Sequence, residues 1–477
     1  MHQVSGKVAS SSPQNSKPYG LGNYIVLAIY WFALSFLWGG FLSIILPALN
    51  KPLAIPIFGE DKVETARGIV SGLGLIIAMF VQPFSGAISD RSTHRMGRRR
   101  PFIVVGTLGG ICALGIVAFA GNWWILLLGY ILLQLADNTA QGAYQGLMPD
   151  IVPEDKRGKA SAALSISQLF GTLLGAVIPG ILQGSLGEVA GSQISLLLIA
   201  IDFVIMTAIT VIFVKEKPYV SDEKISAWQA GISMFKGVGQ YPDFVRLLLA
   251  RFLFLAGPAS LSLFIKPFFE NNGFIEPKLV SGKLETNAGA TTSIVLGLVI
   301  VMAVLAAYPA AALSEKIGRK KVIYLATAIG LVGTIGMLLP YFIMTGAVTE
   351  AKSLEATARQ AQLNTIRPLA IAITVFFGSL TGTSWGVFMA VDWAFATDLI
   401  PLNEAGRFMG LSNLATAGCQ AFAAFIGGFI VDSSLGFVGF FIVVSLYFVV
   451  SAIVLTRVRE TRGRQAMLPS QPELVGN

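Results

Sequence analysis

Residues 89–103 read SDRSTHRMGRRRPFI, a short polar stretch between two long apolar runs. It carries one aspartate and five arginines. So much positive charge crosses a lipid bilayer only at high cost, so the positive-inside rule places this loop in the cytoplasm and orients the segments on either side of it. Residues 314–321, SEKIGRKK, repeat the pattern in a shorter form. The chain is therefore predicted to contain two repeats of the same arrangement of membrane-spanning segments.

The composition is that of a polytopic membrane protein. Of 477 residues, 54% are hydrophobic and only 13% are charged, and the mean hydropathy is +0.71. The net charge of +8 lies in short loops without interleaved aromatic residues, so we expect contact with the lipid bilayer and no nucleic acid partner. Cys112 and Cys419 lie in apolar runs and form no disulfide framework. No cofactor and no metal ion are expected.

Apolar runs of about 20 residues are long enough to span the hydrocarbon core. They predict an all-α membrane protein with about twelve transmembrane helices, near 24–49, 66–89, 101–120, 123–149, 159–182, 193–214, 243–269, 289–313, 321–344, 367–397, 407–431 and 436–456. An even number of helices puts both termini on one side, the cytoplasm, and we expect a monomer in the cell (inner) membrane.

The predicted helices divide into two six-helix bundles, 23–214 and 243–456. A disordered cytoplasmic tail over 1–22 precedes them and a second tail over 457–477 follows. The linker 215–242 is either a polar connection or a helix in the interface plane, because apolar residues recur in it at helical spacing. On the outer side, 345–366 is predicted to form a short charged surface helix.

A second repeat lies in the loops after the fourth and tenth helices. Asp150-Ile151-Val152-Pro153 precedes Gly158-Lys159, and Asp398-Leu399-Ile400-Pro401 precedes Gly406-Arg407 at the same spacing. Two parallel six-helix repeats are the arrangement of carriers that rock about a central site.

These features resemble the major facilitator superfamily along the whole chain, with 86–100 as the family's loop 2–3 motif. The longer form of that loop is similar to the sucrose-carrier and glycoside-pentoside-hexuronide cation-symporter branch. Residues 134–142, QLADNTAQG, also resemble the helix-four segment of sucrose carriers. Sucrose carriers have an acidic residue at the position of Gln134 and an arginine at that of Gln145, whereas here the carboxylate is Asp137. The resemblance implies the major facilitator fold and cation-coupled sugar uptake.

One face of the predicted fourth helix is polar. Its members recur at three- and four-residue spacing: Gln134, Asp137, Asn138, Gln141 and Gln145. Such a face is unfavourable in lipid, so it must face the bundle interior or a water-filled path. We expect the four amides to bind solute and Asp137 to couple transport to an ion. The alternative is that these groups only bond the helix to its neighbours.

The predicted tenth helix presents Thr381, Trp385, Phe388 and Asp392 on one face. A tryptophan can stack on the apolar face of a sugar while Thr381 bonds its hydroxyls, although ordinary packing is an equal alternative for Trp385. Asp392 is a candidate for ion coupling or for a gate pair with a loop arginine. Asp202 is a third intramembrane carboxylate.

Both histidines, His2 and His94, lie outside the predicted helices, so ion coupling must use a carboxylate. A buried carboxylic acid favours its neutral form and gains charge when its site hydrates, which is the basis of a proton switch. Carboxylate and amide oxygens can equally coordinate sodium, so the coupling cation is either H⁺ or Na⁺.

The charged loops are expected to act as a cytoplasmic gate that bonds to the ends of neighbouring helices in the outward-open state. The candidates come from the repeated motifs: Asp90, Arg91, Arg98, Asp150, Glu315, Arg319, Asp398 and Arg407. At the outer end of the seventh helix, Lys266 is expected to snorkel toward solvent beside Glu270.

The sequence thus favours a secondary transporter of a small polar solute, a sugar or glycoside. An efflux carrier for amphipathic compounds is the nearest alternative, although the amides of the fourth helix count against it. A carrier-like membrane sensor is a remote alternative, because neither tail is long enough to fold alone. The chain has no nucleotide-binding P-loop and no Ser/His/Asp arrangement at one depth, so we expect neither a primary pump nor an enzyme.

Overall fold

The computed structural model describes residues 20–153, 156–216, 238–280, 283–399 and 405–459. Most of the expected tails, 1–22 and 457–477, and of the linker 215–242 lie outside these ranges. The domain boundaries therefore stay predictions.

The N-terminal half begins with a long helical segment that contains a π-helical turn, Phe41–Ile45. A single π-turn inside an α-helix displaces the side chains that follow it and is frequent near functional sites. The α-helices of this half are α1 (Leu21–Gly40), α2 (Leu46–Phe58), α3 (Val63–Asp90), α4 (Arg100–Ala118), α5 (Trp123–Gln145), α6 (Leu147–Ile151), α7 (Arg157–Leu186) and α8 (Glu188–Phe213).

The C-terminal half repeats this plan with longer helices and one small hairpin. Its elements are α10 (Pro242–Asn271), β1 (Lys278–Val280), β2 (Lys283–Glu285), α11 (Gly289–Ile317), α12 (Arg319–Gly336), α13 (Leu338–Ala351), α14 (Ala356–Asp398), α15 (Ala405–Val431) and α16 (Gly436–Thr456). The strands β1 and β2 pair antiparallel, with Leu279 opposite Leu284.

The predicted spans agree with these helices in order, but the predicted 24–49 continues to Phe58 and the predicted 367–397 begins at Ala356. Among the described residues, eleven helical segments are long and apolar enough to cross a membrane. The helix α5 is not among them because its polar face lowers its hydropathy, but it packs between α3 and α4 inside the bundle. At 23 residues it is about 35 Å long, enough to span the hydrocarbon core.

Two local features differ from the sequence predictions. The prediction of a separate short surface helix over 345–366 is wrong. The end of α13 and the start of α14 occupy this region and are joined by a short turn over 352–355. The hairpin β1–β2 was not expected, since its few residues carry no strand-length pattern of alternating hydrophobicity.

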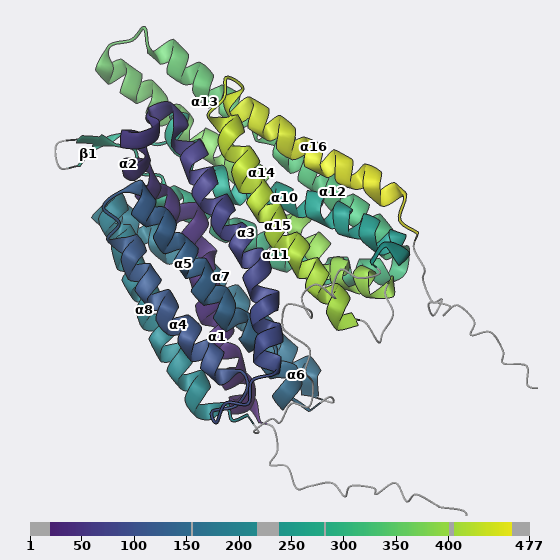
Figure 1. Ribbon diagram of the computed structural model, residues 1–477. Helices are drawn as coiled ribbons and strands as arrows, with labels where there is room; N and C mark the ends of the chain where they lie inside the picture. The colour runs from purple at the N-terminus through teal and green to yellow at the C-terminus, as the bar shows by residue number, and fades with distance from the viewer. Residues whose placement is uncertain (1–19, 154–155, 217–237, 281–282, 400–404, 460–477) are drawn as a thin grey trace, which may run out of the picture.

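The helices form two bundles that lean apart (Figure 1). The hairpin end of the molecule carries α2, β1–β2 and the α13–α14 turn, and the opposite basic end carries α6 and the arginine-rich loop 91–99. Along the seam, α3 packs against α15 and α7 packs against α11. The ribbons of the two halves are close at the hairpin end and diverge toward the basic end (Figure 1).

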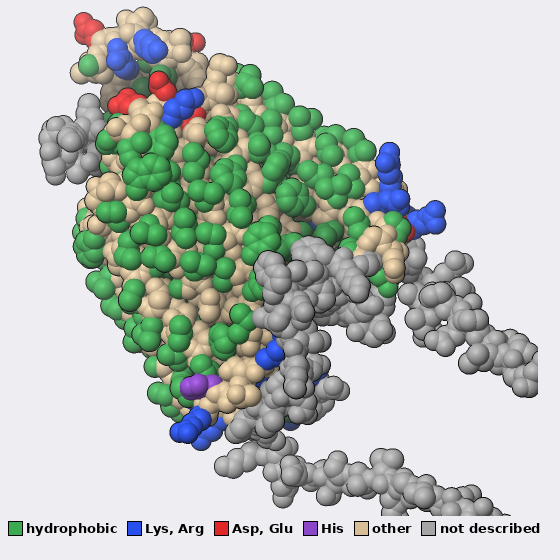
Figure 2. All heavy atoms as spheres, in the orientation of Figure 1, with side chains coloured by type: hydrophobic (Ala, Val, Ile, Leu, Met, Phe, Trp, Pro, Cys, Tyr) green, Lys and Arg blue, Asp and Glu red, His purple; other side chains and the backbone are tan. Residues whose placement is uncertain are grey.

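Small residues let helices approach closely inside each half. The Cβ atom of a larger residue at Gly39 or Gly40 of α1 would collide with the backbone of α7, and one at Gly175 would collide with Phe36. Close contact through glycine is typical of helix packing in membranes, where there is little hydrophobic force between helices. In Figure 2, hydrophobic side chains cover the middle of the visible face and charged side chains gather at its ends.

Candidate functional site

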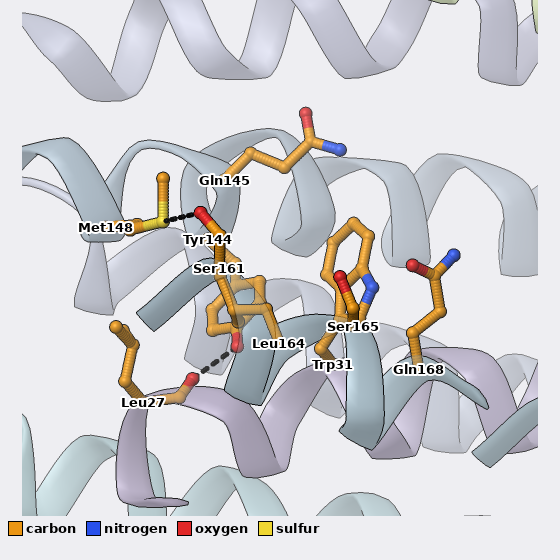
Figure 3. A pocket seen from close by; sticks show the side chains of 9 residues that line it. All are labelled: Leu27, Trp31, Tyr144, Gln145, Met148, Ser161, Leu164, Ser165 and Gln168. Carbon is orange, nitrogen blue, oxygen red and sulfur yellow. Dashed lines mark hydrogen bonds between the residues drawn. The ribbon is translucent and has the colours of Figure 1, made fainter. Parts of the chain in front are cut away.

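A cavity of about 250 Å³ lies in the N-terminal half between α1, α5, α6 and α7 (Figure 3). Trp31 of α1 stacks on Tyr144 of α5, with ring centroids 5.7 Å apart and planes inclined by 23°. The hydroxyl of Tyr144 donates a hydrogen bond to the backbone oxygen of Leu27, which holds the ring in place. The polar side chains that line the cavity are Gln145, Ser161, Ser165 and Gln168.

The polar face of α5 turns mainly into the packed interior of this half. Trp38 Nε1 of α1 donates a 2.7 Å hydrogen bond to Asp137 Oδ2, and only 3% of Asp137 is exposed. Gln134 Nε2 donates to Tyr130 Oη over 2.6 Å, and Asn138 Nδ2 donates to Gln134 Oε1 over 2.8 Å. These buried polar groups have partners, as the low dielectric of the interior requires.

The other two amides of this face lie nearer the basic end. Gln141 is half-buried, and Gln145 is exposed and lines the cavity. The predicted stripe is thus divided: Gln145 borders open space, while Gln134 and Asn138 bond within the half. Their predicted roles in solute binding remain predictions.

The face of α14 that was expected to bind solute packs inside the C-terminal half. Thr381 is buried beside Gly333 of α12 and donates to the backbone oxygen of Phe377. Phe388 stacks on Phe254 of α10 with centroids 3.9 Å apart. Trp385 is half-buried against the hydrophobic core. Solute contacts by Thr381 and Trp385 therefore stay predictions.

Asp392 belongs to a buried ion pair that sequence reasoning missed. Arg251 Nη1 of α10 bonds to Asp392 Oδ2, and Arg251 Nη2 donates to Thr416 Oγ1 of α15 over 3.0 Å. The exposed fractions of the two charged side chains are 3% and 0%. An arginine inside the apolar run 247–255 was the available signal, because ionisable residues are rare in transmembrane helices and need a partner. The partner of Asp392 is thus an intramembrane arginine.

Asp202 of α8 is partly buried, and within the described part of the chain its Oδ2 atom has no hydrogen-bond partner. Its predicted role in ion coupling stays a prediction.

A sequence model of the major facilitator superfamily matches residues 24–417. The chain belongs to the major facilitator superfamily. It is therefore an integral, multi-pass membrane carrier. Its relatives include sucrose transport proteins, in agreement with the resemblance seen in the sequence.

The relatives include proteins named as sugar transporters and proteins named as multidrug resistance carriers. The sucrose transport protein SUC3 of Arabidopsis thaliana is 30% identical over a match that covers 31% of this chain and 31% of that protein. The multidrug resistance protein MdtG of Proteus mirabilis is 24% identical and is matched over 77% of this chain and 90% of its own length. The crystal structure of a D-xylose-proton symporter superposes with a TM-score of 0.66 at 16% identity, covering 92% of this chain and 99% of that one. That likeness shows the shared fold.

The superfamily's loop motif at the basic end is organised around Arg99, which was not among the predicted gate residues. Arg99 pairs with Asp90 at the end of α3, and its Nε lies 3.0 Å from Asp150 Oδ2 in α6. Arg99 Nη1 also donates to Ser89 Oγ over 2.7 Å. Arg98 pairs with Asp150 as well. Only 5% of Arg99 is exposed, whereas the side chain of its partner Asp90 is 52% exposed, so the network lies at the boundary between the bundle and water.

Two of the remaining gate candidates make described contacts inside their own halves, and two others lie outside the description. Arg91 donates to the backbone oxygen of Ala87, and Arg319 donates to that of Ala394 in α14. Glu315 is at the end of α11, and the side chains of Asp398 and Arg407 lie outside the described residues. A gate across the two halves at the basic end stays a prediction.

Removing the Arg99 side chain should destabilise the N-terminal half. In Arg99→Ala, Asp90 and Asp150 lose a shared partner, which should lower the unfolding free energy by about 1–3 kcal/mol. Arg99→Lys should recover only part of this, because an ammonium cannot bond two carboxylates in the fixed geometry of a guanidinium. Thermal unfolding of the purified protein measures the effect. Arg95→Ala, on an exposed residue of the same loop, is the control, and an equal shift in both variants would contradict the role of Arg99.

At the hairpin end, several contacts join the two halves. Arg67 of α3 donates to the backbone oxygen of Leu263 in α10, and its guanidinium lies 4.3 Å from the centre of the Phe264 ring. The Thr65 backbone N–H donates to Asp432 Oδ2 over 2.5 Å. Asn287 Nδ2 donates to the backbone oxygen of Gln183 over 2.7 Å. The molecule is thus closed at the hairpin end.

The expectation that Lys266 snorkels is wrong. Its side chain is fully buried at the hairpin end and pairs with Glu188 of the other half. The two halves close over this position, so the lysine side chain meets Glu188 there and does not reach the solvent toward which a snorkelling lysine extends.

Proposed function

We propose that this carrier is a secondary active transporter of a small polar solute, a sugar or glycoside, which works by alternating access and is coupled to a gradient of H⁺ or Na⁺. The observation that carries this proposal is the cavity of Figure 3, where stacked aromatic rings and uncharged hydrogen-bonding side chains border the same space.

The lining matches the two chemical faces of a sugar. The Trp31 ring offers an apolar surface on which the C–H face of a pyranose can stack. Gln145 and Gln168 each supply both donors and an acceptor, and Ser161 and Ser165 supply hydroxyls, which together suit a ring of hydroxyl groups. The volume of about 250 Å³ is near the lower limit of ligand pockets, which suits a compact solute.

The coupling carboxylate in this proposal is Asp137, because Asp137 and its partner Trp38 lie on the same two helices, α5 and α1, that line the cavity. On α1, Trp38 bonds to Asp137 and Trp31 lines the cavity; on α5, Asp137 lies two turns before Tyr144. A change in the charge of Asp137 would alter its bond to Trp38 and so the packing of α1 on α5. Solute binding and ion binding would then be linked through the same helix pair.

The proposed orientation places the basic end and both termini in the cytoplasm of a cell membrane, following the arginine-rich loop. The structure closed at the hairpin end would then be an inward-facing state. We propose that the protein acts as a monomer, since each chain contains both halves of the rocking unit.

An efflux carrier for amphipathic compounds is the second candidate, and a specific observation favours it. The match to the multidrug resistance protein covers most of both chains, at 24% identity. Reconstituted vesicles separate the two functions, because uptake of sugars and extrusion of amphipathic dyes differ in both ligand and direction.

Replacing Trp31 should weaken solute binding sharply. In Trp31→Ala the stacking surface is lost, and affinity for a bound sugar should fall about 10-fold or more. Trp31→Phe should keep part of the affinity because a smaller ring still stacks. Thermal-shift screening against sugars, glycosides and amphipathic drugs would first identify a ligand, since binding to the folded state raises its apparent stability.

The control is Trp124→Ala, since Trp124 is largely exposed at the start of α5 and away from the cavity. Equal affinity of the Trp31→Ala variant and the parent protein would remove Trp31 from the site. Stabilisation by amphipathic drugs alone would favour the efflux function.

A further inference from the structure

Three charged side chains meet at the hairpin end where the two halves touch. Lys266 of α10 has no exposed surface, and its Nζ atom lies 2.6 Å from Glu188 Oε1 of α8 and 3.5 Å from Glu270 Oε1. Glu188 belongs to the N-terminal half and the other two to the C-terminal half. The exposed fractions of the glutamate side chains are 12% and 6%. We call these three residues the Lys266 triad.

The charges of the Lys266 triad do not balance when both glutamates are ionised. Glu188 Oε1 and Glu270 Oε1 both approach Lys266 Nζ, so the two carboxylates share one buried ammonium. Two carboxylates held around one cation repel each other, and such pairs are stable when they hold one proton between them. With one proton bound, the triad is neutral.

Among the side chains that the structure describes, the groups around the triad do not supply a second buried positive charge. Glu270 Oε1 also accepts the Ala288 backbone N–H over 3.2 Å, which is a neutral donor before α11. Asn287 and Gln183, which bond to each other nearby, are neutral amides. Lys51 of α2 adds positive charge from a side chain that is partly exposed, where solvent and salt screen it.

We propose that the Lys266 triad is a proton-binding site whose occupation closes the hairpin end. A proton from the adjacent solution binds to a carboxylate oxygen of Glu188 or Glu270 as the two halves come together. When the halves separate at this end, water enters, both carboxylates are hydrated, and the proton returns to the solution. The proposal rests on alternating access, as proposed above, and is independent of which solute is carried.

Acid on the hairpin side should therefore favour the closed hairpin end. The closed state binds one proton more than the open state, so its population rises as the pH of that side falls. Two other acidic groups lie at the seam of this end. Glu64 of α3 is buried and pairs with Arg67 of the same helix, at 2.5 Å. Partial burial against α3 raises the pKa of Asp432 above its usual value, despite the bond from Thr65. The variant Asp432→Asn removes that contribution.

Distances between spin labels across the hairpin end test the proposal. Labels at Ser185 and Ser434, both exposed and in opposite halves, would be placed in a variant in which Cys112 and Cys419 are replaced. In this otherwise unaltered chain, lowering the pH from about 8 to about 5 should shift the distribution of label distances toward the short distance of the closed state. Glu270→Gln keeps the size of the side chain but cannot ionise, so its distribution should be short at both pH values.

Two control variants should retain the pH response: Glu60→Gln, on an exposed residue of the same end, and Asp432→Asn. If Glu270→Gln does not fold, Glu188→Gln provides the same test. A distribution in the unaltered chain that does not change with pH would overturn the proposal, as would an unchanged pH response in both glutamine variants. Because no solute is added, a pH response that depends on the triad would support this site even if sugar transport were disproved.

Discussion

Asp137→Asn is expected to abolish uphill accumulation of solute while leaving exchange of solute across the membrane intact. Asparagine has the size of aspartate and can still accept the hydrogen bond from Trp38 Nε1, but it cannot change its charge. Without a change of charge, a proton or sodium gradient has no effect on the α1–α5 contact. The carrier should then equilibrate its solute without concentrating it.

The measurement uses proteoliposomes loaded with and without solute. A proton or sodium gradient is imposed, and accumulation of solute against its own concentration gradient is measured. In Asp137→Asn this accumulation should fall to the equilibrium level. Exchange of labelled for unlabelled solute should continue at a rate near that of the parent. Asp202→Asn is the matched control, because Asp202 is also an intramembrane carboxylate but is less buried. If Asp137→Asn still concentrates solute, coupling must depend on Asp202 or Asp392. If the parent protein itself does not concentrate solute, the protein is a facilitator.

The second large effect is expected at the Arg251–Asp392 pair. Removing one partner leaves an uncompensated charge inside the membrane-spanning bundle, so Arg251→Met or Asp392→Asn should lower the unfolding free energy by about 3–5 kcal/mol. The double variant Arg251→Met/Asp392→Leu removes both charges and should recover much of that loss, because the cost of burying them disappears as well.

Chemical and thermal unfolding in detergent measures these differences. Arg246→Met is the control, since Arg246 pairs with Asp243 one turn away in α10 but is 44% exposed. An exposed pair of this kind contributes about 0–1 kcal/mol. Single and double variants of equal stability would contradict a coupled buried pair, and a transport defect in a fully stable double variant would indicate that the pair acts in the transport cycle.

The sequence determined the features that depend on local pattern. Hydropathy over about 20 residues located most of the helices, although the first helical segment continues to Phe58 and α14 begins at Ala356, each beyond the predicted end. The loop at 89–103 with its shorter copy indicated two repeats of the superfamily fold. The interior position of Gln134, Asp137 and Asn138 on α5 also followed from the sequence, because residues three and four apart share one side of a helix and polar groups are costly in lipid.

The tertiary structure alone decided which of these side chains meet. Trp31 and Tyr144 form a cavity wall, Arg251 pairs with Asp392, and Lys266 pairs with Glu188. The members of each pair lie far apart in the sequence and on different helices. Their contact depends on how each helix is rotated and tilted against its neighbours, and no local pattern records those angles. The inward direction of Thr381 and Phe388 on α14 likewise depends on how that helix is rotated.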